Sequence, residues 1–175
     1  MAQYPIIGGG TQVDDEFLAS MLDNWIIKPA DAPGRVAATL VNDPDLTFPV
    51  VANALYEVEF IIRFAGLQVA GLRTAWAVPA GTTGNRLVGG PGSANVVQAD
   101  ANTTDMRWAI HGYATAVGYT DPRNSTGLQT WVMEKALVAV GGTAGSITFQ
   151  WGQLTANATG TIVNANSYAK YRRIG

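Results

Sequence analysis

A two-residue alternation between residues 53 and 64 constrains the fold of this chain more than any other feature. Apolar side chains take every second position, and mostly charged side chains lie between them. The apolar set is Tyr56, Val58, Phe60, Ile62 and Phe64, and the intervening set is Glu57, Glu59, Ile61 and Arg63. Because successive side chains of a strand point to opposite faces, this pattern predicts an antiparallel strand with one buried face.

Other extended segments follow along the chain, separated by turn residues and without helical periodicity between them. They span residues 36–41, 46–51, 72–78, 106–117, 130–140, 146–153, 159–165 and 167–174. About eight strands at hairpin or longer spacing favour an all-β sandwich or barrel over a parallel α/β sheet. Trp76, Trp108 and Trp151 fall on apolar strand faces and are expected in the core.

Composition excludes several classes of protein. The chain of 175 residues contains no cysteine, so disulfides and thiolate metal sites are excluded. Only 14% of the residues are charged and the net charge is -2, which disfavours nucleic-acid binding. The longest apolar runs, such as residues 136–140, are too short to span a membrane. Sparse charge favours a chain that oligomerises or docks on a partner.

Residues 1–34 are predicted to form an arm that precedes a β domain over residues 35–175. Residues 1–13 are expected to be extended, and residues 14–25 to form a short amphipathic helix. The apolar side chains of the arm either pack on its own domain or dock on a partner. The residues assigned to partner binding are Tyr4, Ile6, Ile7, Phe17, Leu18, Met21, Leu22 and Trp25.

Residues that could carry out chemistry are few, and we expect neither an enzyme nor a cofactor or metal site. His111 is the only histidine, which leaves at most one imidazole for a catalytic triad. Glu57 and Glu59 share a strand face and could in principle form a glycosidase pair. We interpret them instead as part of a solvated or oligomer-contacting face. Asp43-Pro44-Asp45 is predicted to be a turn.

Several segments resemble virion structural proteins of tailed phages, especially phages of actinobacteria. They are Asp-Pro-Asp-Leu-Thr-Phe at 43–48, Asn-Ala-Leu-Tyr-Glu-Val-Glu-Phe at 53–60, Ala-Trp-Ala-Val-Pro-Ala-Gly at 75–81, the Gln-Trp-Gly-Gln run within 149–159, and 166–174. The resemblance implies a jelly-roll β-sandwich similar to the tumour-necrosis-factor and C1q type, usually trimeric. The sequence departs from that pattern at Gly152 and Ala169, where the family has Ala and Leu.

The resemblance implies a capsid decoration protein, a homotrimer on the virion surface that is assembled in the host cytoplasm. Its arm would contact the major capsid protein, and its trimer interface would include Glu57, Glu59, Tyr168 and Tyr171. Tyr168 and Tyr171 lie on opposite faces of the last strand, and the sequence leaves open which of them faces the core. The alternative is a tail or fibre protein that binds a host glycan through residues 81–105 and 119–127.

Overall fold

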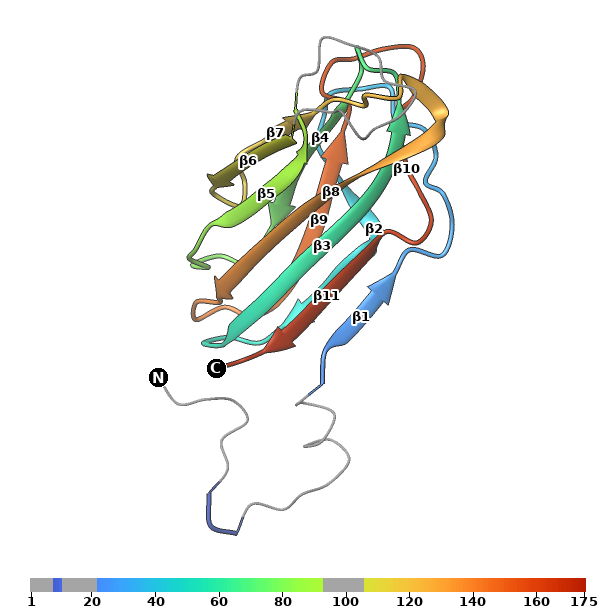
Figure 1. Ribbon diagram of the computed structural model, residues 1–175. Helices are drawn as coiled ribbons and strands as arrows, with labels where there is room; N and C mark the ends of the chain where they lie inside the picture. The colour runs from blue at the N-terminus through green and yellow to red at the C-terminus, as the bar shows by residue number, and fades with distance from the viewer. Residues whose placement is uncertain (1–7, 11–21, 93–105) are drawn as a thin grey trace.

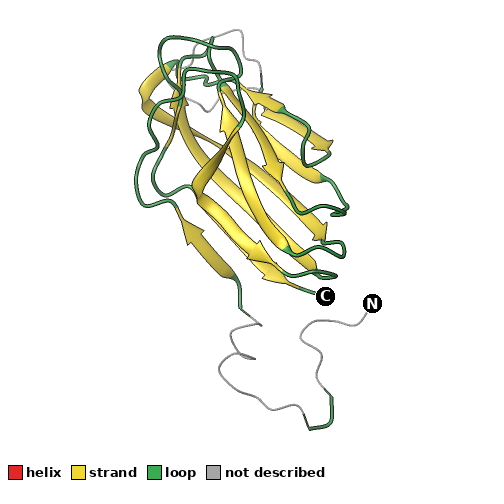
Figure 2. Cartoon of the chain, turned by 180° about the vertical axis from the view of Figure 1, so that it is seen from behind, coloured by secondary structure: helices red, strands yellow, loops and turns green. Residues whose placement is uncertain are grey.

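The computed structural model describes residues 8–10, 22–92 and 106–175, and these form an all-β sandwich (Figures 1 and 2). The strands are β1 (Asn24–Ile27), β2 (Val41–Val50), β3 (Leu55–Gly66), β4 (Leu72–Ala77), β5 (Arg86–Pro91), β6 (Met106–His111), β7 (Val117–Tyr119), β8 (Ser125–Ala139), β9 (Gly145–Gly152), β10 (Ile162–Val163) and β11 (Tyr168–Arg173). No helix occurs within the described ranges. The predicted all-β sandwich is confirmed.

Two antiparallel sheets make up the sandwich. The seven-stranded sheet has the order β1-β11-β3-β8-β5-β6, with β10 also paired to β3, and the four-stranded sheet has the order β2-β9-β4-β7. From β2 to β9 the chain passes repeatedly between the sheets, with β2, β4, β7 and β9 in the smaller sheet, β3, β5, β6 and β8 in the larger one, and only β5 and β6 following each other within one sheet. This alternation supports the jelly-roll interpretation, which remains an interpretation within the confirmed sandwich.

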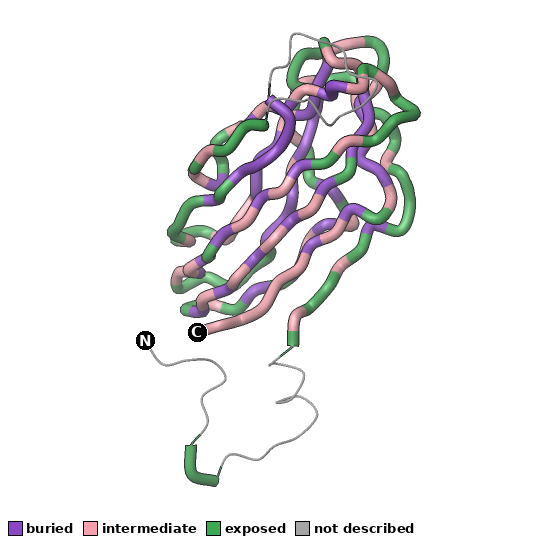
Figure 3. The backbone as a smooth tube through the Cα atoms, viewed as in Figure 1, coloured by how far each residue is buried: buried purple, intermediate pink, exposed green. Residues whose placement is uncertain are grey.

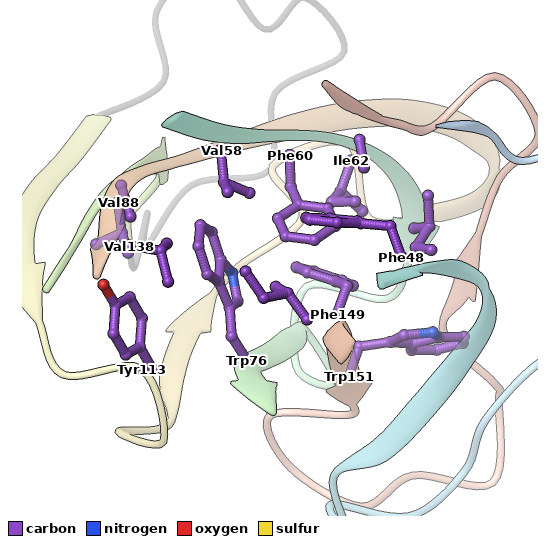
Figure 4. Packing of buried hydrophobic residues seen from close by; sticks show 14 of the residues in the cluster. Phe48, Val58, Phe60, Ile62, Trp76, Val88, Tyr113, Val138, Phe149 and Trp151 are labelled. Carbon is purple, nitrogen blue, oxygen red and sulfur yellow. The ribbon is translucent and has the colours of Figure 1, made fainter. Parts of the chain in front are cut away.

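The core lies between the sheets and is built around the inward side chains of β3. Val58, Phe60, Ile62 and Phe64 are fully buried, as the alternation predicts. Phe60 packs edge-on against Trp76 of β4, with ring centroids 4.8 Å apart (Figure 4). Figure 3 shows the same alternation as buried and partly exposed positions along the strand. The pattern of residues 53–64 therefore predicts which face of β3 is buried.

The last strand, β11, lies inside the larger sheet, between β1 and β3. Ala169 is fully buried, and the Tyr171 ring stacks on Phe48 with centroids 3.9 Å apart. Tyr168 points the other way and contacts Trp25 at 5.1 Å. The structure thus answers the question that the sequence left open, since Tyr171 faces the core and Tyr168 faces outward.

The predicted helix over residues 14–25 is wrong at its C-terminal end. Asn24–Ile27 is a strand that pairs with β11, with Trp25 opposite Lys170. Residues 14–21 lie outside the described residues. After β1, the Lys28 N–H donates to the Ser167 carbonyl at 2.8 Å, and the Arg35 N–H donates to the Thr161 carbonyl at 2.9 Å. Residues 24–35 are therefore bonded into the sandwich and do not belong to a separate arm that ends at residue 34.

A buried ion pair fastens this N-terminal stretch to the smaller sheet. Lys28 Nζ lies 3.1 Å from Asp43 Oδ1 and 2.6 Å from Asp45 Oδ2. The other oxygen of Asp43 accepts a 2.9 Å hydrogen bond from Trp151 Nε1. The Asp43-Pro44-Asp45 segment lies within β2, where the register with β9 shifts, so the predicted simple turn is wrong. An irregular stretch of strand aims two carboxylates at one buried ammonium group.

A second buried ion pair joins two neighbouring strands of the larger sheet on their core-facing side. Arg86 of β5 contacts Glu134 of β8, and both side chains are fully buried. Glu134 also accepts hydrogen bonds from Trp76 Nε1 at 2.6 Å and from the Tyr119 hydroxyl at 3.0 Å. Burial and the neighbouring carboxylate raise the pKa of Tyr119, which keeps its hydroxyl a donor. These bonds satisfy the Glu134 carboxylate inside the protein, so its charge has a structural role.

Candidate protein-interaction surface

The outer face of the smaller sheet is small and polar. The hydroxyl groups of Thr47 and Thr148 are 2.7 Å apart across β2 and β9. Gln150 Nε2 donates to Asn42 Oδ1 at 2.8 Å on the same two strands. This is the surface expected where one face of an antiparallel sheet meets water. The outer face of the larger sheet can be compared with this polar face of the same molecule.

The outer face of the larger sheet is different, because one row of side chains crosses all six strands of its main path without a single charge. Successive cross-strand partners in this apolar row are Ile27, Tyr168, Ile61, Met133, Gly89 and Trp108. The exposed fraction is 58% for Ile27 and 64% for Trp108, at the two ends of the row. An apolar row of this length is not the usual solvent face of an antiparallel sheet.

The neighbouring row carries charges only in its middle. Its successive partners are Trp25, Lys170, Glu59, Lys135, Leu87 and Ile110. The charged residues of this row, with three neighbours, form a stripe over β11, β3 and β8. We call this the charged stripe, and its members are Asp23, Glu57, Glu59, Lys135, Lys170 and Arg172. Farther along the face, Arg63 lies opposite Trp131.

Ion pairs neutralise the charged stripe internally. Lys135 Nζ lies 3.0 Å from Glu57 Oε1, Lys170 Nζ lies 2.8 Å from Asp23 Oδ2, and Arg172 contacts Glu57 at 3.2 Å. The hydrogen bond from Lys135 lowers the pKa of Glu57, and Asp23 raises the pKa of Lys170. With three acids and three bases, the stripe has no net charge.

Apolar side chains remain exposed at both edges of this face, where β1 and β6 are the outermost strands (Figure 1). The β1 strip consists of Leu22, Trp25 and Ile27, which are 66%, 54% and 58% exposed. The β6 strip consists of Leu87, Met106, Trp108, Ile110 and Leu137, which are 54%, 43%, 64%, 66% and 57% exposed. A groove of ≈ 430 Å³ runs beside the β6 strip, lined in part by Leu87, Ile110 and Leu137.

The residues predicted for partner binding fall into three groups. Leu22 and Trp25 belong to the exposed β1 strip, and Glu57, Glu59 and Tyr168 lie on the same outer face. Tyr171 packs into the core, away from that face. Tyr4, Ile6, Ile7, Phe17, Leu18 and Met21 lie outside the described residues. Their contacts with a capsid, and the contacts of the outer face with other protomers, remain predictions.

Trp108 was predicted to lie in the core, and this prediction is wrong. Trp76 and Trp151 are buried as predicted, whereas Trp108 is 64% exposed. Its ring covers Gly89 of β5, where an added Cβ would lie 2.3 Å from a ring carbon. The glycine opposite Trp108 is the local signal that could have revealed this outward packing.

The residues that were candidates for catalysis are paired with other residues of the sheet. His111 ends β6 opposite Arg86, and Glu57 and Glu59 are engaged by Lys135. Among residues 8–10, 22–92 and 106–175, no three His, Asp or Glu side chains gather as a metal site. Within the same ranges there is no helix long and apolar enough to cross a membrane.

Comparisons with known proteins give only distant likenesses. No protein-family model and no curated protein matches the sequence. The tripod (BppUct-A-L) from the baseplate of bacteriophage Tuc2009 aligns with a TM-score of 0.30 and 12% identity, over 95% of this chain and 72% of that chain. A structure of infectious bursal disease virus, Gx strain, aligns with a TM-score of 0.18 and 12% identity, over 99% of this chain and 41% of that chain. At these scores neither likeness says what this chain does.

Proposed function

We propose that this chain is a virion structural protein, a homotrimer that binds the outer surface of a capsid shell and stabilises it. The observation that carries the proposal is the apolar row across the outer face of the larger sheet, which ends in the exposed side chains of Ile27 and Trp108. Contiguous exposed apolar surface of this kind marks a protein interface. The resemblance of segments within residues 43–60 and 149–174 to phage virion proteins is the reason for proposing a virion as the assembly.

The capsid contact is assigned to the segment before β1, with Tyr4, Ile6, Ile7, Phe17, Leu18 and Met21 as its apolar side chains. A trimer presents three such segments at once. Linking three weak contacts in this way raises the overall avidity by about 10²–10⁴-fold without any new contact. A decoration protein can therefore hold a lattice tightly through short peptides.

Glycan binding by a tail or fibre protein is the less favoured alternative. Part of the loop at residues 119–127 is already engaged within the chain. Asp121 is buried and accepts backbone N–H bonds from Gly66 and Arg123, both at 2.9 Å. Asn124 Oδ1 accepts a bond from the Gln68 N–H at 2.8 Å. These polar groups are used for folding, which leaves fewer of them to recognise a sugar.

Co-sedimentation with capsids that lack the protein tests the proposal. The purified chain should pellet with empty shells to a saturating, fixed stoichiometry, and a variant that lacks residues 1–21 should stay in the supernatant. A lysozyme-sized unrelated protein serves as the trapping control. Binding to isolated tails but not to shells would contradict decoration, and specific signals on a glycan array would favour the alternative.

A further inference from the structure

We infer that the β6 strip of one copy seats the β1 strip of the next copy, so that the chain closes a ring with its charged stripes turned toward the axis. This inference rests on the homo-oligomer of the proposed function and names the surfaces that build it. Leu22 and Trp25, which were predicted to contact the capsid, are thereby assigned to contacts between protomers.

The positions of the two strips favour a head-to-tail contact. Trp25 and Ile27 of the β1 strip lie on the same outer face as the β6 strip but at the opposite edge of the larger sheet. Contacts between two different patches generate closed rings when the rotation between neighbours closes. Copies whose larger sheets face a common axis bring the β1 edge of each sheet against the β6 edge of its neighbour.

The chemistry of the strips favours a second copy as the occupant. The β6 strip contains five large apolar side chains, each about half exposed, or a patch on the order of 500 Å², which is within the size range of functional apolar patches on protein surfaces. Such a patch requires an apolar counterpart, and this chain itself provides one in Leu22, Trp25 and Ile27. A charged partner would gain little here, because ion pairs already satisfy the charged stripe between the two strips.

The charge balance of the stripe makes the ring feasible. Residues near the axis of a ring face their own symmetry copies, so a net charge there would repel. Asp23, Glu57 and Glu59 are balanced by Lys135, Lys170 and Arg172 within each copy. The predicted position of Glu57, Glu59 and Tyr168 in the oligomer is then the inner wall of the ring.

Light scattering on matched variants tests which surfaces associate. Ile27 and Ile110 are 58% and 66% exposed, one in each strip, and Val69 is 66% exposed in the turn between β3 and β4. The wild type and Val69→Glu should have a mass of about 55 kDa, three times 18.4 kDa. Ile27→Glu and Ile110→Glu should each fall to the monomer mass while keeping the wild-type circular dichroism and a cooperative melting transition, at a lower temperature than the trimer. A monomeric wild type, or a mass unchanged in both variants, would overturn the inference.

Cross-linking separates a head-to-tail contact from a like-to-like contact. The chain has no cysteine, so introduced thiols are the only targets of a bismaleimide linker. The double variant Ile27→Cys/Ile110→Cys should give a covalent ring, and either single variant alone should remain uncross-linked. A cross-linked dimer of Ile110→Cys alone would overturn the inference in favour of like strips meeting. A ring that fails to bind capsids would leave the inference standing and contradict the proposed decoration.

Discussion

Lys28 is the residue that fastens the N-terminal part of the sandwich. It is 2% exposed, and its ammonium group neutralises the fully buried Asp43. Lys28→Met should lower the free energy of unfolding by about 3–5 kcal/mol, because it leaves a buried carboxylate without its cation. Urea unfolding followed by tryptophan fluorescence measures the change.

Asp45 offers the matched control, since it binds the same ammonium group but is 37% exposed. Asp45→Asn should cost about 1 kcal/mol or less, because solvent screens the partly exposed member. The double variant Lys28→Met/Asp43→Asn should recover part of the loss. Equal costs for Lys28→Met and Asp45→Asn would show that the buried charge of Asp43 does not set the stability of this corner.

Asp121 should make the stability of the sandwich depend on pH. Burial raises the pKa of its carboxyl from 3.8 to about 6, although two backbone N–H groups oppose this rise. Between these values the folded state binds more protons than the unfolded state, so the contribution of Asp121 to stability falls as the pH rises. The fall amounts to about 2 kcal/mol between pH 4 and pH 7, with no further loss above that range.

The comparison of wild type with Asp121→Asn over that pH range isolates this contribution. Asn cannot ionise, so the difference between the two stability curves should change across the window, whatever the fixed cost of the substitution. Curves that stay parallel from pH 4 to pH 7 would show that Asp121 keeps an ordinary pKa in the folded state.

At the scale of the element, β1 is the first strand of the sandwich, and the segment assigned to capsid binding precedes it. Removal of residues 1–21 leaves β1 and Lys28 in place, so the free energy of unfolding should stay within about 1 kcal/mol of the full chain. Removal of residues 1–28 deletes the edge strand and the cation of Asp43, and stability should fall by several kcal/mol. Thermal melts of the two truncations measure the contrast. If the variant that lacks residues 1–21 failed to fold, part of that segment would belong to the core.

Elements with a strict period could be predicted from the sequence, whereas the choice of face depended on tertiary pairing. The alternation in β3 identified both faces correctly, because Glu57, Glu59 and Arg63 all fell on one side and five apolar side chains from Tyr56 to Phe64 fell on the other. In β6 the period grouped Met106, Trp108 and Ile110 on one face but did not say which way they point. The smaller Ala109 packs toward the core, and Trp108 lies over Gly89 on the outside.

Two further features depended on residues distant in the sequence. Residues 24–27 form a strand although the spacing of apolar residues up to Trp25 predicted a helix. The reason is that β11 provides hydrogen-bonding partners for these residues, and this pairing outweighs their weak helix propensity. The Arg86–Glu134 pair joins positions 48 residues apart. Nothing in either local segment indicated that these charges would be buried together.

At the scale of the whole molecule, the two outer faces of the sandwich differ in the side chains that they carry. On the smaller sheet, the largely buried Thr148 pairs with Thr47, and Gln150 bonds Asn42, so these polar groups are satisfied within the sheet. The outer face of the larger sheet carries the apolar row. It also carries the β1 and β6 strips, with the charged stripe, which has no net charge, between them. The account therefore places every association between copies on one side of the molecule and leaves the smaller sheet outside.

A cryo-EM reconstruction of the parent phage particle tests this account most directly. We expect threefold density on the outer surface of the capsid shell, with the larger sheets facing the threefold axis and the smaller sheets facing solvent. Density for this chain found only at the tail tip, or a larger sheet whose outer face is fully open to solvent on the shell, would contradict it.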